Sequence, residues 1–270
     1  MNMMNIRVLA VAMVALPFPA SAATLCTLVA DLAGGRILIE EGNCGMRATP
    51  ASTFKIPLAV MGFDSGFLAK AHAPNLPFKS GYPDWAGEAW RQPTDPTRWM
   101  KYSVVWYSQR ITEHLGTERF GRYVAALGYG NADISGDPGK QNALERSWIS
   151  SSLKISPREQ VDFLARLLTR ELPVSKAAIE RTIEIVEGRP MPDGWQVSGK
   201  TGGAYPRNAD GSFNRARGWG WYVGWARKDA ITVVFARLTQ DERRQQGSPG
   251  LRARDAFLAD WPRLARTITR

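Results

Sequence analysis

The chain has 270 residues, of which 44% are hydrophobic and 22% charged, and its formal net charge is +10 at pH 7. This composition predicts a compact soluble protein with one large domain or two subdomains that share a core. The excess of Lys and Arg can attract small anions, but it is scattered and contains no run of five basic residues. The charge pattern therefore excludes a typical nucleic-acid-binding segment, and we expect no nucleic-acid partner.

The first 22 residues have the features of an export signal. Arg7 precedes the apolar run VLAVAMVALPF, and Ala20 and Ala22 supply the small residues of a cleavage site before Ala23. Two prolines interrupt the apolar run, which is too short for a membrane anchor, and no later segment has transmembrane length. We therefore expect residues 1–22 to be a cleaved signal peptide and the mature protein to be periplasmic, without a membrane anchor.

The only two cysteines, Cys26 and Cys44, flank the first predicted β-hairpin. The residues at about 24–42 alternate like two strands around Gly34-Gly35, a turn signal. Because disulfides persist outside the reducing cytosol, export favours a Cys26–Cys44 bridge, and the alternative is two buried free thiols. The two histidines lack ligand spacing with the cysteines, so no metal site is predicted.

The middle of the chain is predicted to be mainly helical, beginning with the helix that carries Ser52. The segment SPREQVDFLARLLTREL predicts another helix. Ser156 is its N-cap, Pro157 is the first helical residue and Glu159 completes a capping box. Its apolar residues recur at helical spacing and form a core-facing stripe of Val161, Leu164 and Leu168.

Strands return between about residues 195 and 238. The segments WQVSGKTGGAY, GWGWYVGWAR and AITVVFARL are rich in β-branched and aromatic residues, and turn signals separate them at Asp210-Gly211 and Lys228-Asp229. The last segment, PGLRARDAFLADWPRLAR, predicts a helix that covers these strands.

Strands from both ends of the chain are expected to share one sheet in a single domain, residues 23–270. The α/β part comprises about 23–57 and 190–270, and the helical middle forms an inserted lobe at about 58–189. The predicted fold class is therefore α/β, in its α+β form.

Ser52 and Lys55, in ASTFKIPLAV, are the first candidates for catalysis. Residues three apart on a helix share a face, so the amine can reach the hydroxyl. A nucleophilic serine needs an adjacent base, and burial among apolar neighbours can lower the pKa of the lysine enough to provide one. Taken alone, S-x-x-K recurs by chance, and the alternative is a capping serine followed by a lysine whose amine reaches solvent.

Further motifs follow in order along the chain: S-x-V at 103–105, Y-G-N at 129–131, K-T-G-G at 200–203, and W-x-x-G in GWYVGW. Together with S-T-F-K they resemble the class D β-lactamases, the oxacillinase-type serine penicillin hydrolases, over essentially the whole mature chain. The resemblance implies the penicillin-recognising serine hydrolase fold, a β-lactamase/transpeptidase-like architecture. Its sheet is mostly antiparallel and flanked by helices, and the site lies in a cleft beside the helical lobe.

The resemblance also implies a mechanism for hydrolysis of the β-lactam ring of penicillin-type antibiotics, the activity that confers resistance to them. Ser52 forms the acyl-enzyme, and Lys55 reacts with carbon dioxide to give N6-carboxylysine, the general base for acylation and deacylation. Trp148, whose indole is only a donor, hydrogen-bonds to this carbamate, whereas it would otherwise be read as a core residue. Carbon dioxide apart, no cofactor is implied.

Three more side chains receive roles from the resemblance. Ser103 relays a proton to the leaving β-lactam nitrogen, Val105 shields the carbamate, and Lys200 supplies positive potential from an edge strand. Their alternatives are a hydroxyl satisfied by the backbone, a core valine and a solvated surface charge.

The remaining roles concern substrate binding. Thr201 and Arg252 bind the substrate carboxylate, Arg252 through its forked donors. The backbone N–H groups of Ser52 and Gly203 form the oxyanion hole, and Gly202 belongs to the same K-T-G-G motif. Gly203 departs from the family, where this position often carries a bulkier residue, and it puts the substrate preference in doubt. The other motif residues are expected to shape the rim of the site, namely Tyr129 and Asn131.

Two alternatives from other functional classes remain open. One is a non-hydrolytic β-lactam sensor domain, which usually carries a polar residue in place of Val105. The other is a cell-wall transpeptidase or carboxypeptidase, but the Y-G-N motif and Trp148 do not favour this alternative. The class A motif set fails because Ser103 is followed by Val104-Val105 rather than by S-D-N. The choice among oxacillin, cephalosporin and carbapenem substrates depends on loops near Trp99 and Met100, and neither this choice nor the oligomeric state follows from the sequence.

Overall fold

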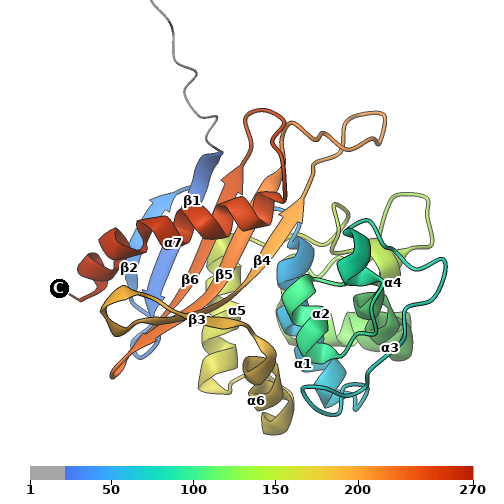
Figure 1. Cartoon of the computed structure of the whole chain (residues 1–270), viewed down its shortest axis with the longest axis horizontal. Helices are drawn as coiled ribbons and strands as arrows, with labels where there is room; N and C mark the ends of the chain where they lie inside the picture. Colours follow the sequence, from blue (N-terminus) through green and yellow to red (C-terminus); the bar gives the residue numbers. More distant parts are fainter. Residues whose placement is uncertain (1–21, 270) are drawn as a thin grey trace, which may run out of the picture.

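The structure is a computed structural model that describes residues 22–269 (Figure 1). The predicted signal peptide lies outside the described residues except for Ala22, and remains a prediction. One six-stranded antiparallel sheet has the order β2-β1-β6-β5-β4-β3. Its strands are β1 (Ala23–Asp31), β2 (Ile37–Gly42), β3 (Gly188–Pro190), β4 (Gln196–Ala204), β5 (Trp219–Lys228) and β6 (Ile231–Gln240).

Helices cover both faces of the sheet and form a lobe beside it (Figure 1). The C-terminal helix α7 crosses the face shown at the front, and α5 packs behind it against β1, β5 and β6. The α-helices are α1 (Lys55–Asp64), α2 (Pro96–Tyr102), α3 (Val105–Ala126), α4 (Ala143–Arg146), α5 (Pro157–Thr169), α6 (Lys176–Ile185) and α7 (Pro249–Ile268). Short 3₁₀ helices are η1 (Ala51–Phe54), η2 (Gly87–Trp90) and η3 (Pro192–Gly194).

Burial on both faces explains why the central strands are apolar at nearly every position. In β6, alternate side chains point to opposite faces, so Phe235 packs with Phe257 and Trp261 of α7 while Val234 and Leu238 join the larger core on the other side. The rings of Phe235 and Phe257 stack with centroids 4.3 Å apart. The sheet is therefore held between two apolar layers.

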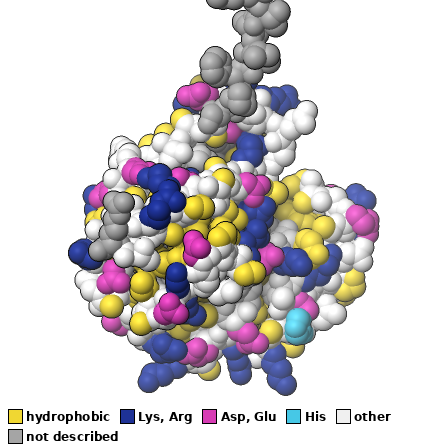
Figure 2. Space-filling view, turned by 60° about the vertical axis from the view of Figure 1, so that its left-hand side comes forward, with side chains coloured by type: hydrophobic (Ala, Val, Ile, Leu, Met, Phe, Trp, Pro, Cys, Tyr) yellow, Lys and Arg dark blue, Asp and Glu magenta, His cyan; other side chains and the backbone are white. Residues whose placement is uncertain are grey.

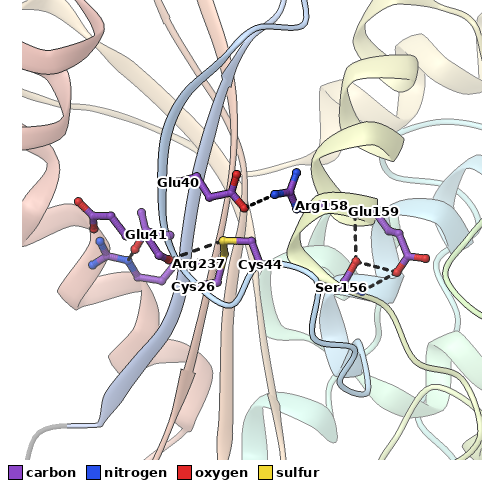
Figure 3. Close-up of a disulfide and its surroundings, with 9 residues drawn as sticks. Cys26, Glu40, Glu41, Cys44, Ser156, Arg158, Glu159 and Arg237 are labelled. Atoms are coloured by element: carbon purple, nitrogen blue, oxygen red, sulfur yellow. Dashed lines mark hydrogen bonds and ion pairs between the residues drawn. A yellow bond between two sulfur atoms is a disulfide. The ribbon is translucent and has the colours of Figure 1, made fainter.

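The first hairpin is formed as predicted and is closed by the Cys26–Cys44 disulfide (Figure 3). Both cysteines are buried, and the bridge joins β1 to the segment that follows β2. At the turn, Gly35 has a φ of +65°, a conformation that favours glycine. β1 also pairs with β6, so strands from the two ends of the chain share the sheet, as expected.

The start of α5 also follows its sequence pattern. The Ser156 hydroxyl accepts a hydrogen bond from the Glu159 backbone N–H at 3.3 Å, and the Glu159 carboxylate accepts one from the Ser156 backbone N–H at 2.8 Å (Figure 3). The sequence predicted that residues 58–189, which include α5, form the helical lobe. In the structure α5 instead packs on the sheet, because its apolar stripe faces β1 and β6.

The positive charge does not concentrate in one patch on the face shown in Figure 2, where Asp and Glu side chains lie among the Lys and Arg side chains. Ion pairs neutralise part of it, as between Arg263 and Glu41 at 2.8 Å and between Arg237 and Asp260 at 2.7 Å. Within residues 22–269, no helix combines the length and apolarity needed to span a bilayer.

Replacing both cysteines, as in Cys26→Ala/Cys44→Ala, should lower stability by about 3 kcal/mol, because the bridge restricts the unfolded chain. For a domain of this size, that loss corresponds to a fall of roughly 6–12 °C in Tm, measured by calorimetry. The intact wild-type protein should be lighter than its reduced form by the two thiol hydrogens. Two reactive thiols in the denatured, unreduced chain would contradict the bridge.

Candidate active site

A cleft of about 690 Å³ opens between the sheet and the helical lobe. Segments far apart in the sequence line it, including η1, the junction of α2 and α3, and β4. The predicted residues that reach the cleft are Ser52, Ser103, Val105, Thr201 and Gly203. The fold thus brings residues from three of the motifs, S-T-F-K, S-x-V and K-T-G-G, to one cavity.

The outer edge of β4 is open where it borders the cleft. β3 pairs with residues 196–198 of β4, and the Gly199 N–H donates to the Glu187 carbonyl at 3.2 Å, but no strand among the described residues pairs with residues 200–204 on that side. Gly202 lies against η1 at a distance that no side chain allows, because a Cβ there would come within 2.7 Å of the Pro50 carbonyl oxygen. The glycines of the K-T-G-G motif therefore let Ser52 and the free edge of β4 approach each other.

Ser52 lies in η1, one turn before α1, rather than in the α-helix that the sequence predicted. Residues three apart nearly eclipse in a 3₁₀ helix, so Ser52 and Lys55 still share a side. Ala51 begins the turn with a φ of +50°, and its N–H donates to the Trp148 carbonyl at 3.0 Å. The Gln160 amide donates to the Thr53 hydroxyl at 2.8 Å and so links this turn to α5.

Lys55 is almost completely buried, with 1% of its surface exposed. Burial lowers the pKa of its amine well below the usual value, and the nearby Lys200 lowers it further. Its Nζ donates to the Ser108 hydroxyl oxygen at 3.0 Å, and the Trp99 indole donates to the same oxygen at 2.9 Å. Within residues 22–269, no hydrogen bond joins Lys55 directly to Ser52.

Ser108 was not identified from the sequence. It lies on α3 one turn after Val105, is fully buried, and is the only hydroxyl found to accept from Lys55 among the described residues. The sequence offers one hint, a small polar residue in the otherwise apolar and aromatic run VVWYS. Such a residue is expected to hydrogen-bond to a buried polar group, but the sequence does not identify that group.

Trp148 is part of the core and packs against the residue that precedes Lys55. Its ring stacks on Phe54, the residue before Lys55, with centroids 5.6 Å apart, and meets Phe120 edge-on. Its carbonyl also accepts from the Thr49 hydroxyl at 2.9 Å. No hydrogen bond from its indole N–H to a protein group is found in the described part of the chain, so this donor can still serve a negatively charged partner.

Lys200 and Ser103 meet across the cleft. The Lys200 amine donates to the Ser103 hydroxyl oxygen at 2.5 Å and lies 3.5 Å from the Thr201 hydroxyl. Burial lowers the pKa of Lys200 to about 7, Glu187 opposes this shift, and Arg254 adds to it. Lys200 can therefore exchange a proton with Ser103 near neutral pH.

Tyr129 and Asn131 lie behind the site and do not line the cleft. The Tyr129 hydroxyl donates to Gln160 at 3.4 Å, and the Asn131 amide donates to the Ser152 carbonyl at 2.9 Å. The Asn131 contact ties its loop to the segment after Trp148, and the Tyr129 contact reaches α5, so neither residue lies at the rim where it was expected.

Arg252 is paired with an acidic side chain, and its role in binding the substrate carboxylate stays a prediction. It lies in the first turn of α7 and does not line the cleft; its guanidinium donates instead to Asp241 at 2.6 Å and to the carbonyls of Gln246 and Gly247. The physical reason is that the nearly buried Asp241 carboxylate requires a counter-charge. Arg215, which the sequence did not single out, lines the cleft instead.

The arrangement supports nucleophilic chemistry on a carbonyl. An accessible serine, a buried amine of low pKa, a second amine paired with a serine, and free backbone N–H groups are the parts of such a site. No group of His, Cys, Asp or Glu side chains in residues 22–269 is arranged to hold a metal ion.

Comparisons with known proteins agree with this geometry. The penicillin binding protein transpeptidase domain family matches residues 26–260. β-Lactamase OXA-9 from Klebsiella pneumoniae is 42% identical over 239 residues, which span 88% of this chain and 87% of that protein. β-Lactamase OXA-1 from Escherichia coli is 36% identical over 186 residues, spanning 69% of this chain and 64% of that protein. The crystal structure of the class D β-lactamase OXA-427 matches with a TM-score of 0.83 and 46% identity, covering 90% of this chain and 99% of that one.

These matches confirm the fold class and the resemblance drawn from the motifs. They extend over the segments that build the cleft, from η1 to the first turn of α7. The chain therefore belongs to the penicillin binding protein transpeptidase domain family and, within it, to the class D β-lactamases.

Proposed function

We propose that the protein hydrolyses the β-lactam ring of penicillin-type antibiotics through an acyl-enzyme on Ser52, and that it acts in the periplasm after export. The observation that carries the proposal is an accessible serine at the cleft followed, three residues later, by a fully buried lysine with a strongly lowered pKa. A lysine in that state can take part in proton transfer at neutral pH, which a solvated lysine cannot.

Acylation requires stabilisation of the negative oxygen that forms when Ser52 attacks the ring carbonyl. The backbone N–H groups of Ser52 and Gly203 are proposed to supply it, because η1 and the open edge of β4 meet there. Gly203 donates through its backbone, so the absence of a side chain leaves this role intact. Its missing side chain widens the cleft beside Ser248, which lies 3.1 Å from where a Cβ would be.

The surroundings of Lys55 fit a carboxylated amine. Carboxylation needs a neutral amine, and complete burial keeps the Lys55 amine neutral. The Ser108 hydroxyl and the otherwise unused Trp148 indole N–H are the donors that a buried negative charge there would need. The carbamate would supply a carboxylate-like general base for both half-reactions. Val105, at the start of α3, would exclude water from this pocket.

The leaving nitrogen needs a proton when the β-lactam ring opens. Ser103 is proposed to donate it and to be reprotonated from Lys200, to which it is hydrogen-bonded at 2.5 Å. Thr201 and the positive form of Lys200 are proposed to bind the ring carboxylate, while Arg252 is paired with Asp241. A sensor domain or a transpeptidase could share the acylation step, so turnover is the property that separates the alternatives.

Ser52→Ala should lower kcat by about 10³-fold or more while the fold is retained, because the nucleophile is lost. Mass spectrometry of wild-type protein treated with penicillin should find the adduct on the Ser52 peptide. Steady nitrocefin hydrolysis should continue after the first equivalent. An adduct elsewhere would refute the assignment, and product formation that stops after one equivalent would favour a sensor or transpeptidase.

Trp148→Phe and Ser108→Ala should each lower turnover about tenfold, because a buried anion loses a donor at a cost of roughly 1–3 kcal/mol. Added bicarbonate should restore part of the activity at mildly acid pH and do little at alkaline pH. With ¹³C-labelled bicarbonate, NMR should show a carbamate signal in wild-type protein that weakens in both variants. Trp195→Phe, a buried tryptophan on the α7 side, is the control and should not respond. The absence of any carbamate signal in wild-type protein at every pH would refute a carboxylated Lys55.

Lys200→Met should change how stability depends on pH. The folded pKa of Lys200 is about 7, while the unfolded pKa is about 10.4, so the unfolded chain binds more protons between these values. The contribution of Lys200 to the free energy of unfolding is therefore most unfavourable below pH 7 and becomes less so as the pH rises. Tm measured from pH 6 to pH 9 should rise more steeply in wild-type protein than in the variant. Lys55 shifts in the same direction, so the difference between the two proteins is the quantity to compare, and parallel curves would contradict the lowered pKa.

A further inference from the structure

The catalytic cleft continues into a second groove at the end of β4. This groove, of about 340 Å³, is lined by Tyr205, Arg215, Arg244, Gln245, Gln246 and Gly247. Three of these residues, Tyr205, Arg215 and Gly247, also line the cleft, so the two spaces are continuous. The loop between β4 and β5 and the loop between β6 and α7 form it, and both leave the sheet at its upper end in Figure 1.

The groove contains two arginines whose charges are not neutralised. Among the described residues, neither Arg215 nor Arg244 has an ion pair or a side-chain hydrogen bond. The guanidinium of Arg215 lies 5.3 Å from the centre of the Tyr205 ring, a cation–π contact that holds it where the groove joins the cleft. Its forked donors thus remain available for an anion.

Several neighbouring charged side chains on the two loops are already engaged. Arg207 pairs with Asp137 at 3.3 Å, Arg217 donates to Gln240 at 2.9 Å, and Asp241 pairs with Arg252. Asp210 binds Ser212, and Glu242 does not line the groove. The groove therefore presents positive charge without an acid of its own.

The register of β4 indicates which part of a substrate would reach these arginines. Thr201, Gly203 and Tyr205 follow one another at alternate positions, so they span about 13 Å along one side of the strand. This step depends on the proposed function: with the ring carboxylate near Thr201 and the carbonyl at Gly203, the acyl side chain points toward Tyr205. The groove, which Tyr205 lines, is therefore where the acyl side chain would end.

We propose that Arg215 and Arg244 bind an anionic group on the acyl side chain of the substrate, so that the enzyme favours β-lactams that carry a second carboxylate there. Two exposed guanidinium groups give a modest but measurable preference, since each charge pair remains partly solvated. The preference concerns substrate selection and leaves the chemistry at Ser52 unchanged.

Benzylpenicillin and carbenicillin provide a matched test, because carbenicillin is benzylpenicillin with an added side-chain carboxylate. The ratio of kcat/KM for carbenicillin to kcat/KM for benzylpenicillin should fall about fivefold to tenfold in Arg215→Gln/Arg244→Gln, with smaller falls in the single variants. Arg243→Gln, on the same loop but outside the groove, is the control and should leave the ratio within about twofold. Added NaCl should lower the ratio in wild-type protein and have little effect in the double variant.

The remaining outcomes test the groove and the proposed function separately. An unchanged ratio in the double variant, an equal loss for both substrates, or the same fall in Arg243→Gln would each overturn the groove as a side-chain site. Hydrolysis of benzylpenicillin but not of carbenicillin by wild-type protein would also overturn it. Failure of wild-type protein to hydrolyse either substrate would instead refute the proposed function.

Discussion

The close contact between Gly202 and η1 is the constraint on which the rest of the site depends. The strand can lie against the turn only because residue 202 has no side chain, and Gly250 at the start of α7 approaches the same glycine from the other side, where a Cβ would lie 2.5 Å from the Gly202 carbonyl oxygen. Three elements therefore meet at one backbone position. Their mutual position sets where the Ser52 and Gly203 N–H groups point, and these groups need fixed geometry to stabilise charge.

Two buried amines give the site its electrostatic character. Lys55 begins α1 and Lys200 lies on β4, and each loses solvation, so the pKa of each is lowered. The positive charge of Lys200 further disfavours charge on Lys55. The apolar and aromatic packing around Lys55, from Phe54 and Trp148, is thus part of the proton chemistry as well as of the core.

Features set by neighbours in sequence could be predicted, as could the sharing of one sheet by both ends of the chain, whereas individual side-chain contacts between distant segments could not. The capping box at Ser156 and the hairpin closed by Cys26–Cys44 are encoded in short patterns. The motif residues were found because their order along the chain is itself a pattern. Ser108 was missed because its role depends on a lysine from another helix. The pairing of Arg252 with Asp241 was missed because that acid lies on the loop before α7, and binding of the substrate carboxylate by Arg252 stays a prediction.

The pairing of β1 with β6 also governs the order in which the molecule can assemble. Val29 pairs with Phe235, so the N-terminal hairpin finds its permanent neighbour only after nearly the whole chain is available. Contacts between such remote segments slow folding, because a long loop must close before they form. Until then, the inner edge of β1 is an unpaired strand edge that can join the wrong partner. A shortened chain that ends before β6 would keep this edge permanently exposed, and its characteristic failure would be aggregation.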